Sequence, residues 1–570
     1  MLNSTKHIGI IGGGPSALFM VKRLVDAGNT DLQITIFEKK NQLGAGMPYS
    51  HLGANDEHVT NVSDNEIPEL VTTISEWIKT VPEDTLNKFN IRRDHFNEYK
   101  VLPRLLFGQY LAAQFKLVLA AAKEKGIAVQ VNYNTTVVDI IDQPKQETTL
   151  VITEAGDNYE FDHIVLCTGH RWPKVHEGKI PGYFDSPYPP SKLGFKVNTP
   201  VAVRGASLTA IDAIRTLSRH NGSYQKDTEG VLTYKVDEAS KGFRLVLHSR
   251  NGMLPAVRFH LEDSHLGKDT VLSNEEIAEA REKNEGFLPL DLVFDRNFKE
   301  SFKAKRPAFY KRIKDVQMEE FVNFMMAMRE QADPFELLQA EYKEAEKSIE
   351  AEESVYWKEM LAVLSFAMNY PAKYFSAEDM LRVQKTLMPL ISIVIAFVPQ
   401  SSVEELLALW KAGVLTLVSV GDDSEVEPVD TGGIVYHYTD EDGKKVAESY
   451  PLFVDSIGQP HLSYNDLPYP GLRENLTVTP AKLLFRDAQL GAAEMEHNKK
   501  VEKDRNGDYV LTVPGVAIND AFQAVDAYGA LNDRIYIMAV PYIGGFNPDY
   551  SGLDFSEAAS ERIAKAILHA

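Results

Sequence analysis

The chain has 570 residues, of which 44% are hydrophobic and 25% are charged, and its formal net charge is −21. That length exceeds what one hydrophobic core can organise, so we expect several domains. The acidic balance argues against a nucleic-acid partner. The one cysteine, Cys167, excludes internal disulfides and any chemistry that needs a redox-active cysteine pair.

The first segment predicts a dinucleotide-binding turn. A short apolar strand that begins at Ile8 leads into a glycine-rich turn and then into a helix over 16–27. Gly12, Gly14 and Ala17 occupy the small-residue positions of a G-x-G-x-x-G/A motif. The first glycine allows a tight turn, the second lets the backbone approach a pyrophosphate, and the third position lets the helix pack on the strand. The N–H groups at the start of the helix would then face the phosphates.

Two features that follow the turn fit the same kind of ligand. The next predicted strand, 34–37, ends at Glu38, whose carboxylate can accept hydrogen bonds from a ribose diol. The loop 43–49 comes next. Its Gly44 and Gly46 suit a backbone that passes close to a ligand, although a plain surface loop is the alternative.

The pattern then predicts a helix over 105–125 and, among later strands, one over 137–141, where the backbone of Val138 can face an adenine. A buried strand that begins at Phe161 ends in a Thr-Gly turn. Cys167 lies on this strand, and we interpret it as a small core residue and not as a catalytic thiol.

A second strand–turn–helix unit repeats the spacing of the first. Gly205, Ser207 and Ala210 take the three small-residue positions, and the serine side chain hinders close approach to a pyrophosphate. The strand after this unit ends in Ser249 and Arg250 instead of an acid. A hydroxyl and a guanidinium suit a 2′-phosphate, which favours NADPH over NADH, whereas a plain surface arginine is the alternative.

The rest of the chain changes character twice. From 265 to 411 the pattern predicts helices with little strand signal, which indicates an insertion. Strand character returns from 415 to 420, and a hairpin turn follows. Near the C-terminus, a buried strand over 534–540 precedes a helix over 555–568.

Several of these segments together resemble the FAD/NAD(P)-binding flavoprotein family that includes FAD-dependent urate hydroxylases, a distant relative of the amine N-hydroxylating monooxygenases. The resemblance is good over about residues 5–260 and weaker for the last strand and helix. It rests on residues 12–17, 44–49, 58–62 with Trp77, 103–111, 167–170, 205–210 and 249–255. The helical insertion has no counterpart in that family, and 455–460 departs from the family's Ala-Thr-Gly-Pro strand end.

The resemblance implies FAD and NADPH as cofactors, with NADH as an alternative to NADPH. It also implies that the N-terminus of the last helix faces the flavin pyrimidine, where its dipole stabilises negative charge. The expected FAD contacts are Gly12, Gly14, Pro15, Ser16, Ala17, Glu38, Lys39, Gly44, Gly46, Met47, Asn61, Arg104, Val138, Thr168, Gly169, Gly552 and Leu553. The expected nicotinamide-nucleotide contacts are Gly205, Ser207, Thr209 and Arg250. We expect no metal site.

The expected fold is therefore α/β, with a Rossmann-like FAD-binding domain, an NAD(P)-binding domain and a helical insertion. The FAD-binding domain would comprise residues 1–195 and 459–570. The NAD(P)-binding domain would comprise 196–264 and 412–458, and the helical insertion 265–411.

The activity that the resemblance implies is NAD(P)H-dependent hydroxylation of a small polar substrate, such as an amine or amino acid, through a C4a-hydroperoxyflavin. Asn61 and His170 are the catalytic candidates, although a histidine after a Thr-Gly turn is often a structural hydrogen-bonding group. Two alternatives stay open: a flavin-dependent reductase or dehydrogenase with a non-oxygen acceptor, and a non-enzymatic flavoprotein whose insertion binds a partner protein. We expect a cytoplasmic protein with no membrane partner, because its longest apolar run, 387–398, is too short to span a bilayer. A homodimer is an open option.

Overall fold

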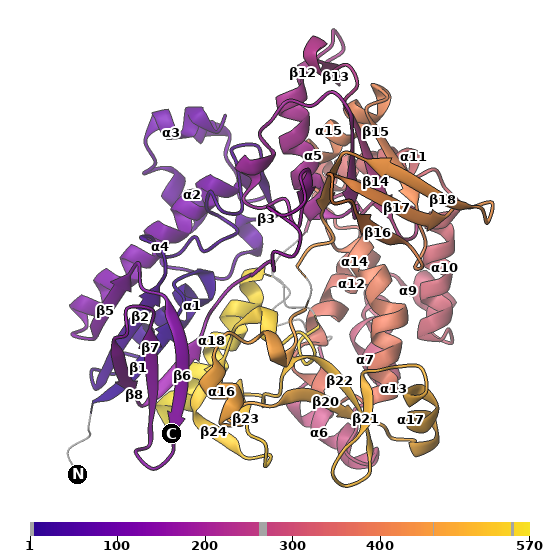
Figure 1. Cartoon of the computed structure of the whole chain (residues 1–570). Coiled ribbons are helices and arrows are strands. Elements are labelled where there is room, and N and C mark those ends of the chain that lie inside the picture. Colours follow the sequence, from indigo (N-terminus) through magenta and orange to yellow (C-terminus); the bar gives the residue numbers. More distant parts are fainter. Residues whose placement is uncertain (1–4, 262–270, 460, 549–551, 570) are drawn as a thin grey trace.

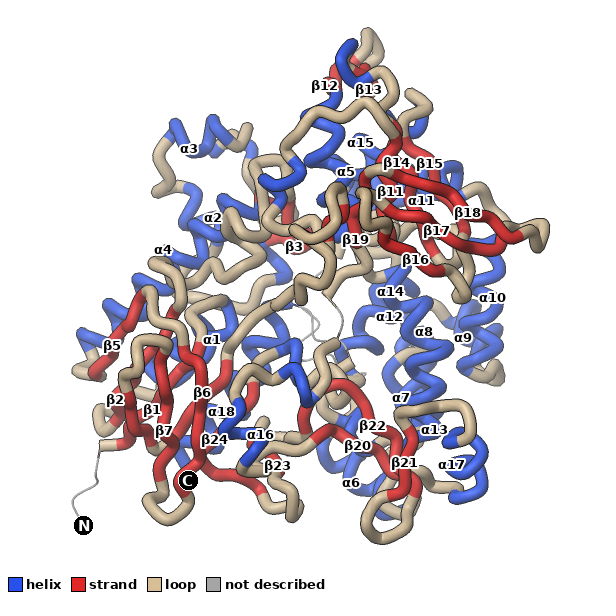
Figure 2. The backbone as a smooth tube through the Cα atoms, in the orientation of Figure 1, coloured by secondary structure: helices blue, strands red, loops and turns tan. Residues whose placement is uncertain are grey.

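The computed structural model describes residues 5–261, 271–459, 461–548 and 552–569. Two mainly parallel β-sheets and a group of helices form three regions, which we call the first domain, the second domain and the helical domain (Figure 1). The chain starts in the first sheet, crosses to the second, passes through the helices, and returns by way of the second sheet to the first. Figure 2 shows the two sheets as separate groups of strands.

The first domain is built on a six-stranded sheet with the order β23-β24-β9-β1-β2-β5, parallel apart from β23. Helix α1 packs against both α4 and α18, and the antiparallel meander β6-β7-β8 contacts β1, β9 and β24. Both faces of the sheet are therefore covered, which is why its strands are continuous apolar runs. The elements are β1 (Lys6–Ile11), α1 (Pro15–Asp26), β2 (Leu32–Glu38), α4 (Arg104–Glu124), β5 (Ala128–Tyr133), β6 (Val137–Gln143), β7 (Thr148–Thr153), β8 (Asn158–Phe161), β9 (His163–Leu166), β23 (Gln523–Val525), β24 (Leu531–Ile537) and α18 (Gly552–His569).

The second domain repeats this order of elements: strand, helix, strand, helix, strand, meander, strand. Its parallel sheet has the order β10-β19-β11-β14-β15. The two domains are thus two copies of one architecture, as the repeated glycine motif predicts. The elements are β10 (Tyr183–Phe184), β11 (Pro200–Arg204), α5 (Leu208–Asn221), β14 (Arg244–Ser249), α15 (Gln400–Lys411), β15 (Leu415–Ser419), β16 (Glu425–Pro428), β17 (Ile434–Thr439), β18 (Lys445–Tyr450) and β19 (Leu452–Asp455).

One expected boundary is wrong. The helical insertion was expected to continue to residue 411, but α15 supplies buried residues such as Val403, Leu406 and Leu409 to the same core as Val201 and Ile214 of the second domain. It is the crossover helix between β14 and β15, so the second domain resumes before α15. Helical periodicity continues across this point and does not indicate which core a helix joins.

In the sequence, the helical domain lies between β14 and α15 of the second domain. Its main helices are α6 (Asn274–Lys283), α7 (Leu290–Asn297), α10 (Met318–Glu330), α11 (Pro334–Ala351), α12 (Tyr356–Ala367), α13 (Ala377–Arg382) and α14 (Met388–Val394). A small antiparallel sheet of β20 (Pro480–Leu484), β22 (Tyr509–Val516) and β21 (Val501–Lys503) packs beside α13. The chain then returns to the first sheet through β24, which begins and ends earlier than the predicted strand 534–540.

Helix α4 is long and apolar enough to cross a membrane by length and composition, a property that core helices share. Its apolar residues, including Leu106, Phe107, Leu111 and Phe115, are buried in the core of the first domain. We therefore describe α4 as the core helix that connects β2 to β5.

Candidate functional site

The first glycine turn has room only for glycine at Gly12. The φ of Gly12 is +104°, and a Cβ there would lie 2.7 Å from the carbonyl oxygen of Cys167 and 3.3 Å from the nitrogen of Thr168. The backbone nitrogen of Gly12 donates to the carbonyl of Phe37 at 2.9 Å. The turn is therefore fixed between the ends of β2 and β9, and a side chain would both strain it and collide with the opposite strand end.

The loop after β2 closes over the same turn. The Gly44 nitrogen donates to the Gly13 carbonyl at 2.8 Å. A Cβ on Gly44, whose φ is +90°, would lie 2.6 Å from the Leu111 carbonyl oxygen, and one on Gly14 would lie 3.4 Å from the Cα of Gly46. Two glycine-containing loops therefore approach each other closely at the start of α1, and the absence of a side chain at Gly14 suits the approach of a pyrophosphate.

The carboxylate of Glu38 braces the turn from the end of β2. It is buried, and it accepts hydrogen bonds from the Gly13 nitrogen and the Lys40 nitrogen, each at 2.8 Å. Each carboxylate oxygen can accept a second hydrogen bond, so the group keeps capacity for a ribose diol. The next residue, Lys39, is exposed.

The predicted C-terminal contacts lie beside this turn. Gly552 and Leu553 begin α18, and the hydroxyl groups of Ser16 and Ser556 are 3.3 Å apart. One turn of helix separates Leu553 from Ser556, so the N-terminus of α18 lies close to that of α1. Two positive helix ends near one turn favour an anionic or electron-rich ligand there.

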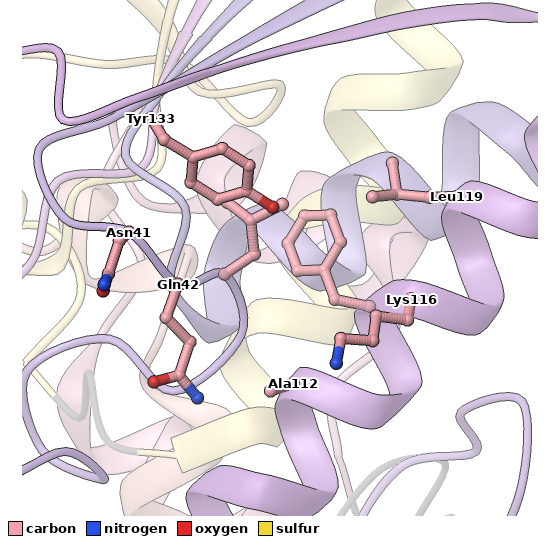
Figure 3. A pocket seen from close by; sticks show the side chains of 8 residues that line it. Asn41, Gln42, Ala112, Lys116, Leu119 and Tyr133 are labelled. Atoms are coloured by element: carbon pink, nitrogen blue, oxygen red, sulfur yellow. The ribbon is translucent and has the colours of Figure 1, made fainter.

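A cavity of about 280 Å³ lies between the loop that follows β2, helix α4 and the end of β5 (Figure 3). Tyr133, which pairs with Glu38 in the register of β2 and β5, forms one wall. Asn41, Gln42 and Lys116 supply polar groups, and Leu43, Ala112, Phe115 and Leu119 supply the apolar surface. The predicted adenine contact, Val138, is exposed at the start of β6 and is not among the residues that line this cavity.

The second glycine turn has nearly the same geometry as the first. The φ of Gly205 is +101°, and a Cβ there would lie 2.8 Å from the Ser456 carbonyl oxygen. The Gly205 nitrogen donates to the His248 carbonyl at 2.8 Å. Ser207, the N-cap of α5, has φ −93° and ψ −166°, against −81° and −163° at Gly14. The serine is therefore accommodated without backbone strain, and the second turn matches the first, the predicted nucleotide cradle.

The other predicted nicotinamide contacts lie around this second turn. A Cβ added to Gly458, at the end of β19, would lie 3.7 Å from the hydroxyl of Thr209. The hydroxyl of Ser249 contacts the side-chain oxygen of Asn251 at 3.2 Å. Arg250 is exposed at the end of β14 and faces Asp422.

Arg104 has an unexpected partner. Its guanidinium forms a buried ion pair with Asp212 of α5, and its Nε donates to the Val59 carbonyl at 3.0 Å. The hydroxyl of Tyr188 donates to the same carboxylate at 2.6 Å. Burial raises the pKa of Asp212, but Arg104 and His58 outweigh it and hold that pKa below its usual value. The predicted contact of Arg104 with FAD stays a prediction, and Asp212 was missed.

His170 lies where the two chain crossings between the domains meet. One of its ring nitrogens shares a hydrogen bond with Gln459 of the returning segment, and its ring lies 5.7 Å from that of Trp172. Burial lowers the pKa of His170, so the ring is neutral. It joins the two crossings, and a catalytic role for it stays a prediction.

Asn61 lies on β3 (Val59–Ser63) and is held by a residue that the sequence analysis missed. The guanidinium of Arg258 donates to the Asn61 carbonyl and to the Ser63 hydroxyl, the latter at 2.8 Å, and pairs with Glu66. Arg258 is only 5% exposed and belongs to the buried segment that follows Arg250. A buried arginine in the segment 256–261, which is otherwise mostly apolar, is the sequence signal that could have revealed it.

The predicted residues thus divide into groups. Gly12, Gly14, Pro15, Ser16, Ala17, Glu38, Gly44, Gly46, Met47, Thr168, Gly169, Gly552 and Leu553 surround the first turn. Gly205, Ser207 and Thr209 surround the second. Among the described residues, no cluster of three or more His, Cys, Asp or Glu side chains could hold a metal ion.

Residues 9–171 match the family described as FAD-NAD(P)-binding, and residues 273–395 match the YdhS-like middle domain. The chain therefore contains an FAD/NAD(P)-binding domain and a helical middle domain within a mixed α/β fold, which confirms the expected fold class and cofactors. It is similar to the uncharacterized protein YdhS of Escherichia coli (strain K12). The two are 29% identical over 571 residues, which cover 99% of this chain and 97% of that protein.

Many solved structures resemble this chain at low sequence identity, and two of them serve as examples. Ornithine hydroxylase (PvdA) from Pseudomonas aeruginosa has a TM-score of 0.48 at 10% identity, with 99% of each chain covered. DfoA, the cadaverine monooxygenase from Erwinia amylovora solved with FAD bound, has a TM-score of 0.47 at 11% identity, with 100% of this chain and 95% of that chain covered.

Proposed function

We propose that the protein is an FAD-dependent NAD(P)H oxidoreductase and, more specifically, a monooxygenase that hydroxylates a small polar substrate. One observation carries the proposal: two glycine turns of matching geometry, at Gly12 and Gly205, stand at the starts of two helices in the two domains. One cradle would hold FAD and the other NAD(P)H. Bound FAD supplies the hydride acceptance and the oxygen chemistry.

The chain's own residues would bind, orient and shield these groups. In the first domain, the backbone around Gly12 and Gly14 would bind the pyrophosphate, Glu38 would bind the ribose, and the N-terminus of α18 would stabilise negative charge on the flavin. In the second, the N–H groups at the start of α5 would bind the nicotinamide nucleotide.

The helical domain would act as a cover for the reaction site. It contacts the first domain through Tyr370, whose nitrogen donates to the Asn547 side chain at 3.2 Å and whose ring lies 3.8 Å from the Arg562 guanidinium. Arg258, in the segment that leads to this domain, is buried against β3. A covered site excludes water, which suits an oxygen-activating flavin.

The proposal is tested by following NADPH and oxygen consumption by the FAD-loaded protein with a panel of small amines and amino acids. Hydroxylated product equal to the NADPH consumed supports the monooxygenase. Hydrogen peroxide alone with every substrate contradicts it. Reduction of an added dye or quinone in the absence of oxygen would then favour the alternative, a reductase with a non-oxygen acceptor.

A non-enzymatic flavoprotein is the third candidate, with the helical domain as the binding surface for another protein. On its exposed side, α10 carries Phe324 and Met328, which are 56% and 54% exposed. Exposed apolar side chains on one helix face are typical of protein contacts. This candidate predicts FAD retention without reduction by NADPH or NADH.

A further inference from the structure

The adenosine end of the second cradle can be located from the repeat itself. In the first domain the Thr135 nitrogen donates to the Glu38 carbonyl at 3.0 Å, and in the second the Val420 nitrogen donates to the Ser249 carbonyl at 2.9 Å. Ser249 therefore occupies the place of Glu38, the ribose-binding acid. The ribose of a nucleotide in the second cradle would lie between the ends of β14 and β15.

Opposite charges face each other at this place. Nη1 of Arg250 lies 3.6 Å from Oδ1 of Asp422, and the two side chains are 75% and 87% exposed. The main chain brings the two residues side by side, because the Gly421 nitrogen donates to the Arg250 carbonyl at 3.0 Å. A second exposed acid, Asp423, follows in the sequence. The guanidinium that suits a 2′-phosphate is therefore already engaged by a carboxylate.

We propose that Asp422 sets the coenzyme preference of the second cradle by competing with the 2′-phosphate for Arg250. NADPH must displace the carboxylate from the guanidinium and place its phosphate close to two acids, whereas NADH carries no such group. Ser249 has no carboxylate that would bind the two ribose hydroxyls and repel a 2′-phosphate, so neither coenzyme is rejected outright. The cradle accepts both, and Asp422 lowers the advantage of NADPH.

This inference rests on the proposed function only in requiring that the second cradle bind a nicotinamide nucleotide. An exposed ion pair is a weak interaction, so the effect of removing it is modest. We expect Asp422→Asn to tighten the binding of a 2′-phosphorylated ligand about three- to fivefold at low ionic strength, with the gain shrinking as salt screens the charges.

Isothermal titration calorimetry of the FAD-loaded protein with 2′,5′-ADP and with 5′-AMP measures this without any turnover. Asp422→Asn should tighten the binding of 2′,5′-ADP and leave the binding of 5′-AMP unchanged. Asp442→Asn is the matched control, because it removes the same charge from the exposed β17–β18 turn of the same domain. Arg250→Ala should bring the affinity for 2′,5′-ADP close to the affinity for 5′-AMP. In the double variant Arg250→Ala with Asp422→Asn, the affinity for 2′,5′-ADP should rise little above that of Arg250→Ala alone.

The inference would be overturned if Asp422→Asn and Asp442→Asn changed the affinity for 2′,5′-ADP equally. It would also be overturned if Asp422→Asn changed the affinity for 5′-AMP by the same factor. The failure of the proposed function would look different: both nucleotides would bind as expected, but neither NADPH nor NADH would reduce the flavin. If the protein binds neither nucleotide, the second cradle is not a coenzyme site and the inference fails with it.

Discussion

Arg104 and Asp212 form a buried ion pair that joins the two nucleotide-binding domains. Arg104 begins α4 of the first domain and Asp212 lies in α5 of the second, and their side chains are 17% and 5% exposed. The Asp212 backbone is also bound, because its carbonyl lies 3.1 Å from Nε2 of the buried His58. Since the His58 Nδ1 accepts from the Asn55 nitrogen, Nε2 carries the proton and donates. This cluster therefore joins the start of α4 in the first domain to α5 in the second.

Removing the carboxylate should be costly. Asp212→Ala leaves the Arg104 guanidinium buried without its counter-charge, so we expect the free energy of unfolding to fall by about 3–5 kcal/mol. Urea unfolding measures this. Asp237→Asn is the control, because it breaks an exposed pair with Lys196 and should change stability by less than about 1 kcal/mol. A small, equal effect of both substitutions would show that the buried pair does not hold the domains.

The two glycine turns should be separable by function. Gly12→Ala places a Cβ 2.7 Å from a backbone oxygen and should abolish FAD retention. Gly205→Ala creates the same collision in the second domain and should leave FAD bound but prevent its reduction by NADPH. The flavin absorbance of the purified protein reports FAD retention, and its loss on mixing with NADPH reports FAD reduction. Gly126→Ala has a similar backbone φ, +75°, with nothing within 4 Å of the Cβ, and it isolates backbone strain from the collision. If it behaves like Gly12→Ala, the collision is not the cause.

Stability should depend on pH through His248. This residue is 1% exposed and stacks on Tyr436 with ring centroids 4.1 Å apart. Burial lowers the pKa of His248 to about 4. The unfolded chain takes up the proton near pH 6.5, so this contribution to stability is complete above pH 6.5 and is lost as the pH falls toward 4. At pH 5 the loss should be about 2 kcal/mol relative to pH 7.5.

Urea unfolding of His248→Phe, which keeps an aromatic ring against Tyr436, should show a smaller difference between pH 7.5 and pH 5 than the parent protein. His497→Gln, at an exposed histidine, should retain the parent difference. The same pH dependence in all three proteins would contradict the assignment to His248.

The thiol of Cys167 should be unreactive in the folded protein. Burial raises the pKa of its thiol, and the side chain is enclosed at the end of β9. Only the thiolate reacts readily, so Ellman's reagent should label no thiol in the native protein and one thiol per chain in urea. Rapid labelling under native conditions would instead identify an accessible, reactive cysteine and reopen the question of thiol chemistry.

The parts of the fold that depend on local backbone geometry were predictable from the sequence. Gly12, Gly205 and Glu38 lie in short motifs whose spacing fixes strand, turn and helix, so their positions followed directly. The assignment of α15 failed because a helical pattern does not specify the core that the helix joins.

The missed residues share a different cause. Asp212 and Arg258 are buried charges whose partners, Arg104 and Glu66, lie more than a hundred residues away. Nothing local in the sequence pairs them. A buried charge is stable only with its partner, and that partner is known once the topology brings the two segments together.

We expect a nicotinamide nucleotide in the second cradle to reduce a flavin in the first. Anaerobic titration of the FAD-loaded protein with NADPH, followed by the visible absorption of the flavin, tests it most directly. We predict complete bleaching at one NADPH per FAD, and its loss in Gly205→Ala. A flavin that stays bound and oxidised in excess NADPH and in excess NADH would contradict this electron transfer.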